Sequence, residues 1–374
     1  MITFNKPYTT GQELEFIEDV VNSSHHSGNG KYTKLCTEYF RTNYGFSKCL
    51  LTTSCTDALE MAAILSEIEK GDEVIVPSYT FVSTANAFAL RGASIIFCDS
   101  NKQNPNLDAS LLEGLITEKT KAIVVVHYAG IACDMKVIRE LCTRRNIILI
   151  EDAAQAIDSF FVEEGVKAPL GSFGDFATFS FHETKNLSCG EGGLLVVNNE
   201  KYFNRADVVW EKGTNRSAFF KGEIDKYGWV DIGSSFLPSE LNAAFLYGQL
   251  LNLQSIQQRR KDIWNNYYKG LREWAITNNV ILPHIPPNGY NNAHMFYMCL
   301  PSLSQRDLFI QRMRENGCQV VFHYQSLHKS VFFKERYLGH DLFNADRYSE
   351  CLVRLPLYVE LDEQNVIDAI LNLS

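Results

Sequence analysis

The chain of 374 residues lacks several features that would assign it to a function class at once. It has no apolar run of the roughly 18 residues that a membrane-spanning helix needs. Its first residues lack the apolar core of a signal peptide. It has no basic excess either, because 35 Lys and Arg stand against 44 Asp and Glu for a net charge of −9. These absences argue against a membrane protein and a general nucleic-acid surface, and they predict a cytoplasmic protein.

Two common signatures of metal and dinucleotide binding are also missing. Ten cysteines are present, but none forms a Cys-x-x-Cys pair, and several stand inside apolar runs. We therefore expect buried free thiols and no metal site. No Gly-x-Gly-x-x-Gly follows the first strand-like run, which counts against a nicotinamide-dependent sugar dehydrogenase. There is no internal repeat and no low-complexity segment.

What is present is an alternation of strand-like and helix-like segments between about residues 50 and 200. Short apolar runs typical of buried strands occur at 73–76, 94–98, 122–127, 147–150, 176–181 and 194–197. Helical patterns separate them, as at 56–69 and 135–145. Continuous apolar strands that alternate with helices are typical of an α/β fold, with a mostly parallel central sheet and helices on both faces. In such sheets a ligand binds beyond the carboxyl ends of the strands.

A second, smaller unit is expected in the last third of the chain. A helical stretch without proline runs from 239 to 274, and one of its faces repeats the apolar residues Ile263, Tyr267, Leu271 and Trp274. After a turn-rich segment, the pattern predicts a strand at 296–300, a helix at 304–316 and a strand at 320–323. We therefore expect a large domain of residues 1–245 and a small α+β C-terminal domain of residues 246–374 that includes the long linking helix.

Two polar motifs carry the strongest functional signal, and each follows a strand-like run. The first is Glu-Asp-Ala-Ala-Gln at 151–155, and the second is Ser-Phe-His-Glu-Thr-Lys-Asn-Leu-Ser-Cys-Gly-Glu-Gly-Gly at 180–193. Asp152 and Lys185 can meet in one pocket, since both lie at strand ends. A lysine forms a Schiff base with pyridoxal phosphate (PLP), and an aspartate keeps its pyridine nitrogen protonated so that the ring acts as an electron sink. The pair therefore predicts a PLP enzyme, with both residues catalytic.

Other residues have the chemistry that this cofactor needs. Gln155 is a candidate to hydrogen-bond the ring oxygen, and Phe81 to stack on the ring. Phosphate binds to backbone N–H groups and hydroxyls at the start of a helix, which favours Cys55 and Thr56, with Ser180 as a further candidate. His182 and Glu183 flank the lysine on the expected substrate side, so His182 is a third catalytic candidate. Weaker candidates for the site are His127, His323, Tyr324 and His328.

These motifs resemble those of the DegT-like sugar aminotransferases, which are PLP enzymes of fold type I. The resemblance runs nearly end to end, through the segments 77–81, 151–155, 180–186, 190–193 and 239–244. It implies the fold-type-I PLP-transferase fold. It also implies cofactor contacts from Asp152, Gln155, Ser180, Lys185, Thr56 and Phe81. Some members carry histidine in place of the lysine and act as dehydratases, and Lys185 argues against that activity here.

Further stretches are similar to a subgroup of this family that aminates a dTDP-linked sugar, namely 50–56, 212–217, 225–227, 231–235 and 292–297. This similarity implies transfer of an amino group from L-glutamate to the C4 ketone of dTDP-4-oxo-6-deoxy-D-glucose. The product is a dTDP-4-amino-4,6-dideoxyhexose for surface polysaccharide synthesis. It also implies a homodimer with shared active sites. Many members have an asparagine that reaches the neighbouring subunit's phosphate, and Ser235 stands at that position here, where a hydroxyl could make the contact.

Several points stay open at the level of sequence. The candidate substrate contacts are Glu183, Asn186, Lys212, Tyr324 and His328. Amination at C3, or of a UDP- or GDP-sugar, is an alternative because the pocket sets the regiochemistry. A catalytically silent PLP-binding regulator is another, although the intact Lys185 and Asp152 weigh against it. The C4 epimer of the product is not determined. No nucleic-acid, membrane or metal partner is expected.

Overall fold

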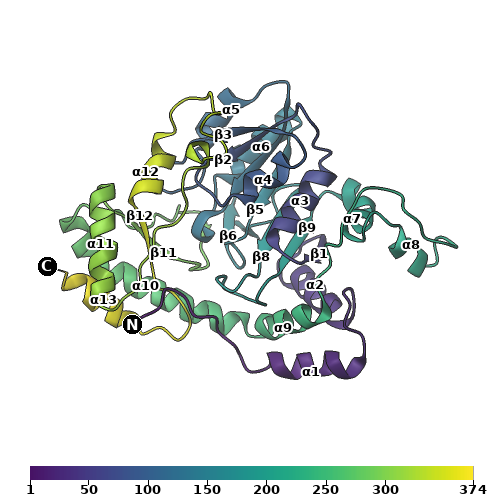
Figure 1. Ribbon diagram of the computed structural model, residues 1–374, viewed down its shortest axis with the longest axis horizontal. Helices are drawn as coiled ribbons and strands as arrows, with labels where there is room; N and C mark the ends of the chain where they lie inside the picture. Colours follow the sequence, from purple (N-terminus) through teal and green to yellow (C-terminus); the bar gives the residue numbers. More distant parts are fainter. Residues whose placement is uncertain (374) are drawn as a thin grey trace.

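The central feature of the computed structural model, which describes residues 1–373, is a seven-stranded sheet in the order β1-β9-β8-β5-β4-β2-β3 (Figure 1). Its strands are β1 (Lys48–Thr52), β2 (Glu73–Pro77), β3 (Ser94–Cys98), β4 (Thr120–Val126), β5 (Ile148–Asp152), β8 (Phe176–Ser180) and β9 (Gly193–Val197). Strand β9 is antiparallel to both of its neighbours, and all the other pairs are parallel. The predicted mostly parallel sheet is confirmed.

The register of the sheet brings three strand ends to one edge. Val126 of β4 pairs with Asp152 of β5, and Asp152 pairs in turn with Thr178 of β8. Beyond this, Ser180 of β8 lies opposite Gly193 of β9. The segments that follow β4, β5 and β8 therefore leave the sheet side by side, which places the two polar motifs together.

Helices cover both faces of the sheet because the strands bury apolar side chains on both sides. One apolar cluster packs under α1 (Glu13–Ser23), α2 (Lys31–Tyr44), α6 (Met135–Arg145) and α9 (Glu240–Leu251). The other packs under α3 (Cys55–Leu65), α4 (Ser83–Ala89) and α7 (Phe203–Trp210). The short helices on the large unit are α5 (Leu112–Leu115) and the 3₁₀ turns Ala109–Leu111, Tyr128–Gly130 and Glu200–Tyr202.

A separate apolar cluster forms the core of the C-terminal unit. Its two-stranded antiparallel sheet pairs β11 (Phe296–Cys299) with β12 (Leu352–Leu355). Around this sheet lie α10 (Leu253–Thr277), α11 (Leu303–Glu315), α12 (Phe343–Cys351) and α13 (Glu363–Leu371), as Figure 1 shows, and a 3₁₀ turn at Leu327–Lys329. The unit combines helices with an antiparallel sheet, as predicted.

Two details of the C-terminal prediction are wrong. The helix expected over 239–274 is two helices, since Asn252 leaves helical geometry and its side chain donates to the carbonyl of Gly248 at 3.0 Å. The strand expected over 320–323 is reduced to one bridge between Val321 and Arg354, because the chain then turns to carry His323 toward the central sheet. The predicted domain boundary at residue 245 falls inside α9, and the division itself stays a prediction.

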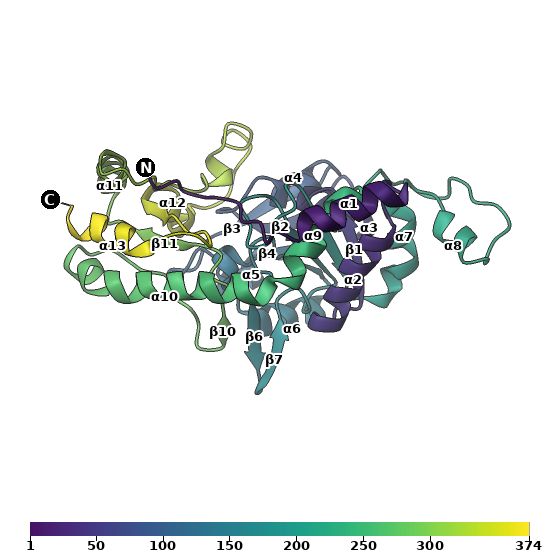
Figure 2. The same ribbon diagram turned by 90° about the horizontal axis from the view of Figure 1, so that it is seen from below.

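Two segments project from this body. A hairpin of β6 (Phe160–Glu163) and β7 (Val166–Pro169), joined by β10 (Gly289–Tyr290), stands out on one side (Figure 2). An arm around α8 (Arg216–Phe220) extends away from the sheet at the opposite end of the molecule from α13 (Figures 1 and 2). No helix within residues 1–373 combines the length and the apolar character needed to span a bilayer.

Candidate active site

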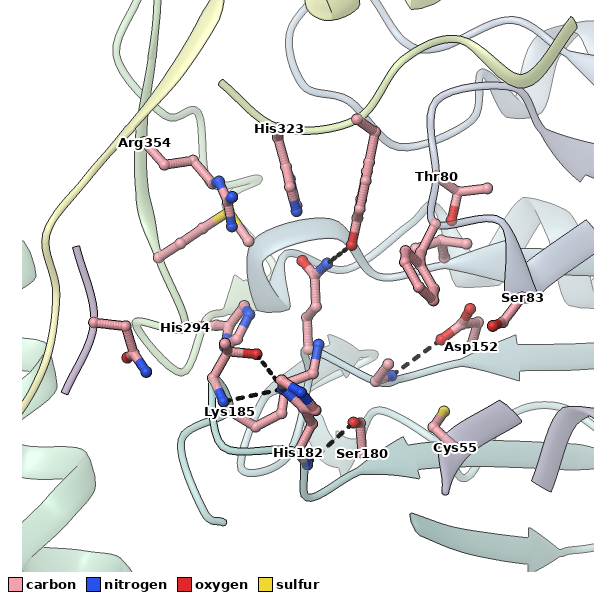
Figure 3. A pocket seen from close by; sticks show the side chains of 18 of the residues that line it. Cys55, Thr80, Ser83, Asp152, Ser180, His182, Lys185, His294, His323 and Arg354 are labelled. Carbon is pink, nitrogen blue, oxygen red and sulfur yellow. Dashed lines mark hydrogen bonds between the residues drawn. The ribbon is translucent and has the colours of Figure 1, made fainter. Parts of the chain in front are cut away.

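A cavity of about 640 Å³ lies at the carboxyl ends of β4, β5 and β8, in the size range of small-molecule sites (Figure 3). Both units contribute to its lining. One side, here called the cofactor side, comes from the large unit and consists of Ser54, Cys55, Thr56, Ser83, Asp152 and Ser180. The other, the C-terminal side, consists of His294, Met295, His323, Tyr324 and Arg354. Figure 3 shows Asp152, Ser83 and Cys55 on one side of the view and Arg354 and His294 on the other, with Lys185 drawn near His294.

Lys185 is held by a loop that folds back on itself after β8. The N–H of Phe181 donates to the carbonyl of Gly192 at 2.8 Å, and the N–H of Lys185 donates to the carbonyl of His182 at 2.9 Å. Burial lowers the pKa of Lys185, against the opposing effects of Cys55 and Asp152. A lower pKa leaves more of the amine neutral near physiological pH, and the neutral amine is the nucleophilic form.

Asp152 ends β5 and is 5% exposed. Its carboxylate accepts hydrogen bonds from the Thr84 hydroxyl at 2.7 Å and from the N–H of Ala154 at 3.2 Å, and the Thr80 hydroxyl lies 2.8 Å from that of Thr84. Burial raises the pKa of Asp152, and these hydrogen bonds lower it. No cationic side chain within residues 1–373 forms an ion pair with it. A protonated pyridine nitrogen would supply the countercharge that this buried carboxylate lacks.

The start of α3 provides an anion site. The first N–H groups of a helix have no intrahelical partner, and Ser54 caps only that of Asp57, at 3.1 Å. Hydroxyls gather beside it, with Thr56 and Ser83 2.8 Å apart. Gly193 of β9 makes the turn possible, because a Cβ there would lie 2.4 Å from the carbonyl carbon of Ser54. The cluster fits a phosphate group.

The space between Asp152 and this anion site fits a flat ring. Phe81 is 54% exposed although it lines the cavity, so one face of its ring is free for stacking. Gln155 lies on the ring's expected edge. Its carbonyl oxygen accepts from the N–H of Ala129 at 2.6 Å, which leaves its amide to donate, and one of those N–H groups points to the Tyr324 hydroxyl at 3.0 Å.

The remaining predicted residues divide into two groups. His182 and Tyr324 line the cavity with the cofactor residues. Six others do not line it: Glu183, Asn186, Lys212, Ser235, His328 and His127, which is buried with its Nε2 2.9 Å from Glu151 Oε2. Of these, Glu183, Lys212 and Ser235 are exposed, whereas His328 is buried with its Nδ1 2.7 Å from the Ser78 hydroxyl.

Asn186 acts on the cavity through a neighbour. Its amide donates to Gln257 Oε1 and to the carbonyl of Asn292, both at 2.8 Å, so its oxygen is left as an acceptor. His294 Nδ1 lies 2.8 Å from that oxygen and therefore carries a proton. Burial lowers the pKa of His294 well below its usual range. The imidazole is neutral, with the lone pair on Nε2 rather than on Nδ1.

Sequence reasoning missed Thr84, His294 and Arg354, and it gave His323 only a weak claim. Arg354 could have been found from the sequence, because it interrupts the apolar run Leu352–Leu357. A charged side chain within a buried strand lowers stability unless it is paired, so its presence there indicates a functional site. The others left no such signal, since a buried threonine or histidine is common in any core. Residues 1–373 contain no group of three side chains that could hold a metal ion.

The fold and this site define a PLP-dependent aminotransferase of fold type I. Residues 7–373 match the model of the DegT/DnrJ/EryC1/StrS aminotransferase family, and the chain belongs to that family. It is therefore a member of a family of PLP-dependent sugar aminotransferases.

Solved structures agree with this assignment over nearly the whole chain. The aminotransferase TlmJ from Streptoalloteichus hindustanus is 28% identical, with a TM-score of 0.89 over 99% of this chain and 98% of that one. Spr1654 from Streptococcus pneumoniae, solved in a PMP form, is 27% identical, with a TM-score of 0.89 and the same coverage. S. venezuelae DesV is 28% identical, with a TM-score of 0.86 over 96% of this chain and 93% of that one.

The residues of the cofactor side fit PLP at each of its functional groups. The α3 start with Thr56 and Ser180 would hold the phosphate, Asp152 the pyridine nitrogen, and Lys185 the aldehyde carbon. When bound, PLP withdraws electrons from the substrate carbon that carries the amino group. The amine of Lys185 would carry the proton that moves, and the carboxylate of Asp152 would keep the ring protonated.

Proposed function

We propose that this protein transfers the amino group of L-glutamate to the C4 ketone of dTDP-4-oxo-6-deoxy-D-glucose. The product, a dTDP-4-amino-4,6-dideoxyhexose, would serve surface polysaccharide synthesis. The observation that carries the proposal is the cavity itself, where Lys185 and Asp152 face a C-terminal side that has two histidines, a tyrosine and an arginine and no carboxylate. The choice of C4 and of dTDP rests on the similarity of the segments 50–56, 212–217 and 292–297 to the subgroup that aminates that sugar.

The C-terminal side is suited to a sugar ring because it offers both donors and acceptors without extra negative charge. Burial lowers the pKa of His323 well below its usual range, so this imidazole is neutral, and its Nδ1 lies 2.7 Å from the Tyr128 hydroxyl. His294 is neutral as well, for the reason given above. Neutral imidazoles and the Tyr324 hydroxyl can bind sugar hydroxyls without repelling a nucleotide diphosphate.

Lys185 has the same duty in both halves of the proposed reaction. Its amine takes a proton from the carbon that loses the amino group, and it returns a proton to the carbon that receives one. The amine must be neutral when it takes each proton, which its burial favours, and it carries that proton as an ammonium until it delivers it. The face of the sugar carbon that the amine reaches decides between the galacto and the gluco epimer.

The test is a product assay with nitrogen-15-labelled L-glutamate. The PLP-loaded enzyme is incubated with dTDP-4-oxo-6-deoxyglucose, and the product is assigned by NMR coupling constants. The proposal expects nitrogen-15 on C4, with the coupling between H4 and its neighbours giving the epimer. Nitrogen-15 on C3 from a 3-oxo isomer, or turnover only with a UDP- or GDP-sugar, would replace the proposed substrate. No transfer to any sugar, with PLP bound, would favour the regulator.

We also propose that the active protein is a homodimer whose arm reaches the neighbouring active site. The arm, residues 214–235 around α8, exposes large apolar side chains, among them Trp229, which is 83% exposed, and Phe220, which is 69% exposed. Such large exposed apolar side chains are typical of an interface. Ser235 lies at the base of the arm, away from its own chain's cavity, where a partner's site could receive it. An isologous interface would place the same segment in both sites.

Complementation tests the shared site. The Lys185→Ala chain is mixed with a chain disrupted between Lys226 and Ser235, after subunit exchange and folding of each are shown independently. A mixed dimer then holds one site with both defects and one with neither. Activity should return in about half of the sites of mixed dimers, as an isologous interface requires. If exchange is confirmed and no activity returns, the arm acts within its own chain.

A further inference from the structure

His294 offers the cavity a hydrogen-bond acceptor that none of the expected cofactor contacts uses. The residue is 8% exposed and lines the cavity on its C-terminal side. Within residues 1–373 its ring makes one hydrogen bond, through Nδ1 to the side chain of Asn186 at 2.8 Å. Asn186 lies outside the lining, so the ring turns its Nδ1 edge away from the cavity. Nε2 is therefore the ring nitrogen that a ligand can reach.

A chain of hydrogen bonds fixes which nitrogen of this ring carries the proton. The carbonyl of Asn292 can only accept, and it accepts from the Asn186 amide at 2.8 Å. The second partner of that amide is Gln257 Oε1, also at 2.8 Å, and the Gln257 amide itself donates to Asp158 at 3.2 Å. Both N–H groups of Asn186 are thus used, and its oxygen faces His294. Nδ1 must therefore donate, which leaves a lone pair on Nε2.

The surroundings also keep the ring neutral. Burial lowers the pKa of His294 well below its usual range, and the charge of Lys185 acts in the same direction. Figure 3 shows His294 drawn near Lys185, the residue that acts on the reacting carbon. A buried acceptor without a donor costs free energy. A ligand that fills this part of the cavity should therefore bring a donor to Nε2.

Only one of the two proposed substrates has a donor at the right place. L-Glutamate presents two carboxylates, which accept hydrogen bonds, and its amino group is engaged with the cofactor. In a 4-oxo-6-deoxyhexose the carbon that must reach Lys185 is C4. Its neighbour C5 bears the ring oxygen and a methyl group, whereas its neighbour C3 bears a hydroxyl. The C3 hydroxyl is therefore the one donor next to the reacting carbon.

We propose that Nε2 of His294 accepts a hydrogen bond from the C3 hydroxyl of the keto sugar, so that His294 selects sugars with a hydroxyl beside the ketone. This inference rests on the proposed function. It assigns His294 to the sugar half-reaction alone, whereas Lys185 and Asp152 act in both halves. A sugar without this hydroxyl would leave a buried acceptor unpaired, and sites built to bind a hydroxyl reject analogues that lack it.

The test compares two sugars that differ in one hydroxyl. Enzyme loaded with pyridoxamine phosphate is mixed with dTDP-4-oxo-6-deoxyglucose or with its 3-deoxy analogue, and the return of the PLP absorbance gives kcat/KM. In the wild type, we expect the 3-deoxy sugar to react about 10- to 100-fold more slowly, as an unpaired buried acceptor predicts. In His294→Leu, which lacks the acceptor, the two sugars should react at nearly the same rate.

Matched variants separate this role from a general loss of structure. His294→Gln keeps an acceptor oxygen and should keep part of the preference for the 3-hydroxy sugar. His284→Leu, which removes an exposed histidine of the C-terminal unit outside the cavity, should match the wild type. The glutamate half-reaction of His294→Leu should be nearly unchanged, which also shows that the variant folds. If it does not fold, the comparison between the wild type and His294→Gln decides.

Nitrogen-15 NMR of histidine-labelled protein tests the lone pair without turnover. The signals of His294 are identified by their absence from the spectrum of His294→Gln. At neutral pH they should show a proton on Nδ1 and none on Nε2. A proton on Nε2, or a charged ring, would make His294 a donor and would overturn the proposal.

The kinetic outcomes that contradict the proposal are distinct from one another. Equal rates for the two sugars in the wild type would show that no group reads the C3 hydroxyl. Loss of the preference in His323→Leu, and not in His294→Leu, would assign the hydroxyl to His323. Equal slowing of both half-reactions with the preference intact would mean that His294 serves Lys185. Reaction with neither sugar, with normal glutamate kinetics, would refute the proposed sugar substrate and leave the NMR result valid.

Discussion

The cofactor side and the C-terminal side of the cavity differ in how their polar atoms are paired and in where their residues come from. On the cofactor side, Asp152, Thr84 and Thr80 form a chain of hydrogen bonds within the large unit. On the C-terminal side, Arg354 has unused donors, and the two histidines are each held by one nitrogen. A fixed cofactor needs one geometry, whereas two different substrates must use the same wall in turn. The pairing of polar atoms therefore distinguishes the side that would hold the cofactor permanently from the side that the two substrates would occupy in turn.

Lys185→Ala should have the largest effect, because no other amine in the cavity can form the bond to the cofactor. We expect turnover to be abolished and the visible absorbance of lysine-bound PLP to be lost. PLP should still bind to this variant, through Asp152 and the anion site at the start of α3. Equilibrium dialysis measures that binding, and normal turnover in this variant would refute the assignment of the lysine.

Asp152→Asn tests the charge on the cofactor side. The variant keeps the shape and loses the carboxylate that keeps the pyridine nitrogen protonated. We expect the glutamate half-reaction to slow by roughly 100-fold or more, as for the loss of a preorganised charge. Stopped-flow absorbance gives the rate. A half-reaction at wild-type speed would mean that another group protonates the ring.

Thr84→Val sharpens the comparison, because it removes one hydrogen bond to Asp152 with little change in volume. A hydrogen bond to a charged group contributes about 1.5–3 kcal/mol, so PLP should bind about 10-fold more weakly or worse. Thr80→Val is the matched control, since its hydroxyl contacts Thr84 and not Asp152. PLP dissociation constants for the two variants check the order. Equal affinities would place the cofactor nitrogen elsewhere.

The smallest expected effect is on the pH dependence of stability. The pKa of His294 is lowered by burial, so below about pH 6.5 the unfolded chain binds a proton that the folded chain does not. Unfolding free energy should therefore fall as the pH falls from 6.5. His294→Gln should reduce this fall by about 1 kcal/mol per pH unit. Burial also lowers the pKa of His323 and of His328. Because the wild type and His294→Gln both contain these two histidines, their contributions cancel in the comparison. Urea unfolding of the apoprotein at pH 6.5 and 5.5 measures the difference, and equal slopes would mean that His294 is charged in the fold.

The contrast between the cofactor side and the C-terminal side also explains which parts of the site the sequence predicts. The large unit follows local rules: apolar runs form its strands, and α6 spans Met135–Arg145 as predicted. Its site residues lie at or just after the ends of those strands, so Asp152, Lys185 and Ser180 line one cavity. The C-terminal side depends on a packing of two units that no local pattern encodes. His294 is adjacent to Lys185 only because Asn186 and Arg260 hold its loop, by contacts across 108 and 34 residues of sequence.

Some predicted contacts failed to reach the cavity for the same physical reason. Asn186 follows the lysine directly, but the tight loop turns its side chain toward Gln257 and the C-terminal unit. His328 is near Tyr324 in sequence, yet a 3₁₀ turn directs it to Ser78 behind the cavity wall. Residues that are neighbours in sequence point in predictable directions along a strand, but in a loop their side chains can point to different parts of the molecule. Ser235 and Lys212 lie outside their own chain's cavity, and a contact between them and an active site depends on the proposed dimer.

The most direct test of the central claim is one spectral cycle on a single sample of PLP-loaded enzyme. L-glutamate should remove the visible absorbance with release of one 2-oxoglutarate per site, as a stoichiometric half-reaction requires. After glutamate is removed, dTDP-4-oxo-6-deoxyglucose should restore the absorbance, because the amino group then leaves on the sugar. An absorbance that glutamate does not remove, or that no keto sugar restores, would contradict the account of this cavity as the site of a sugar aminotransferase.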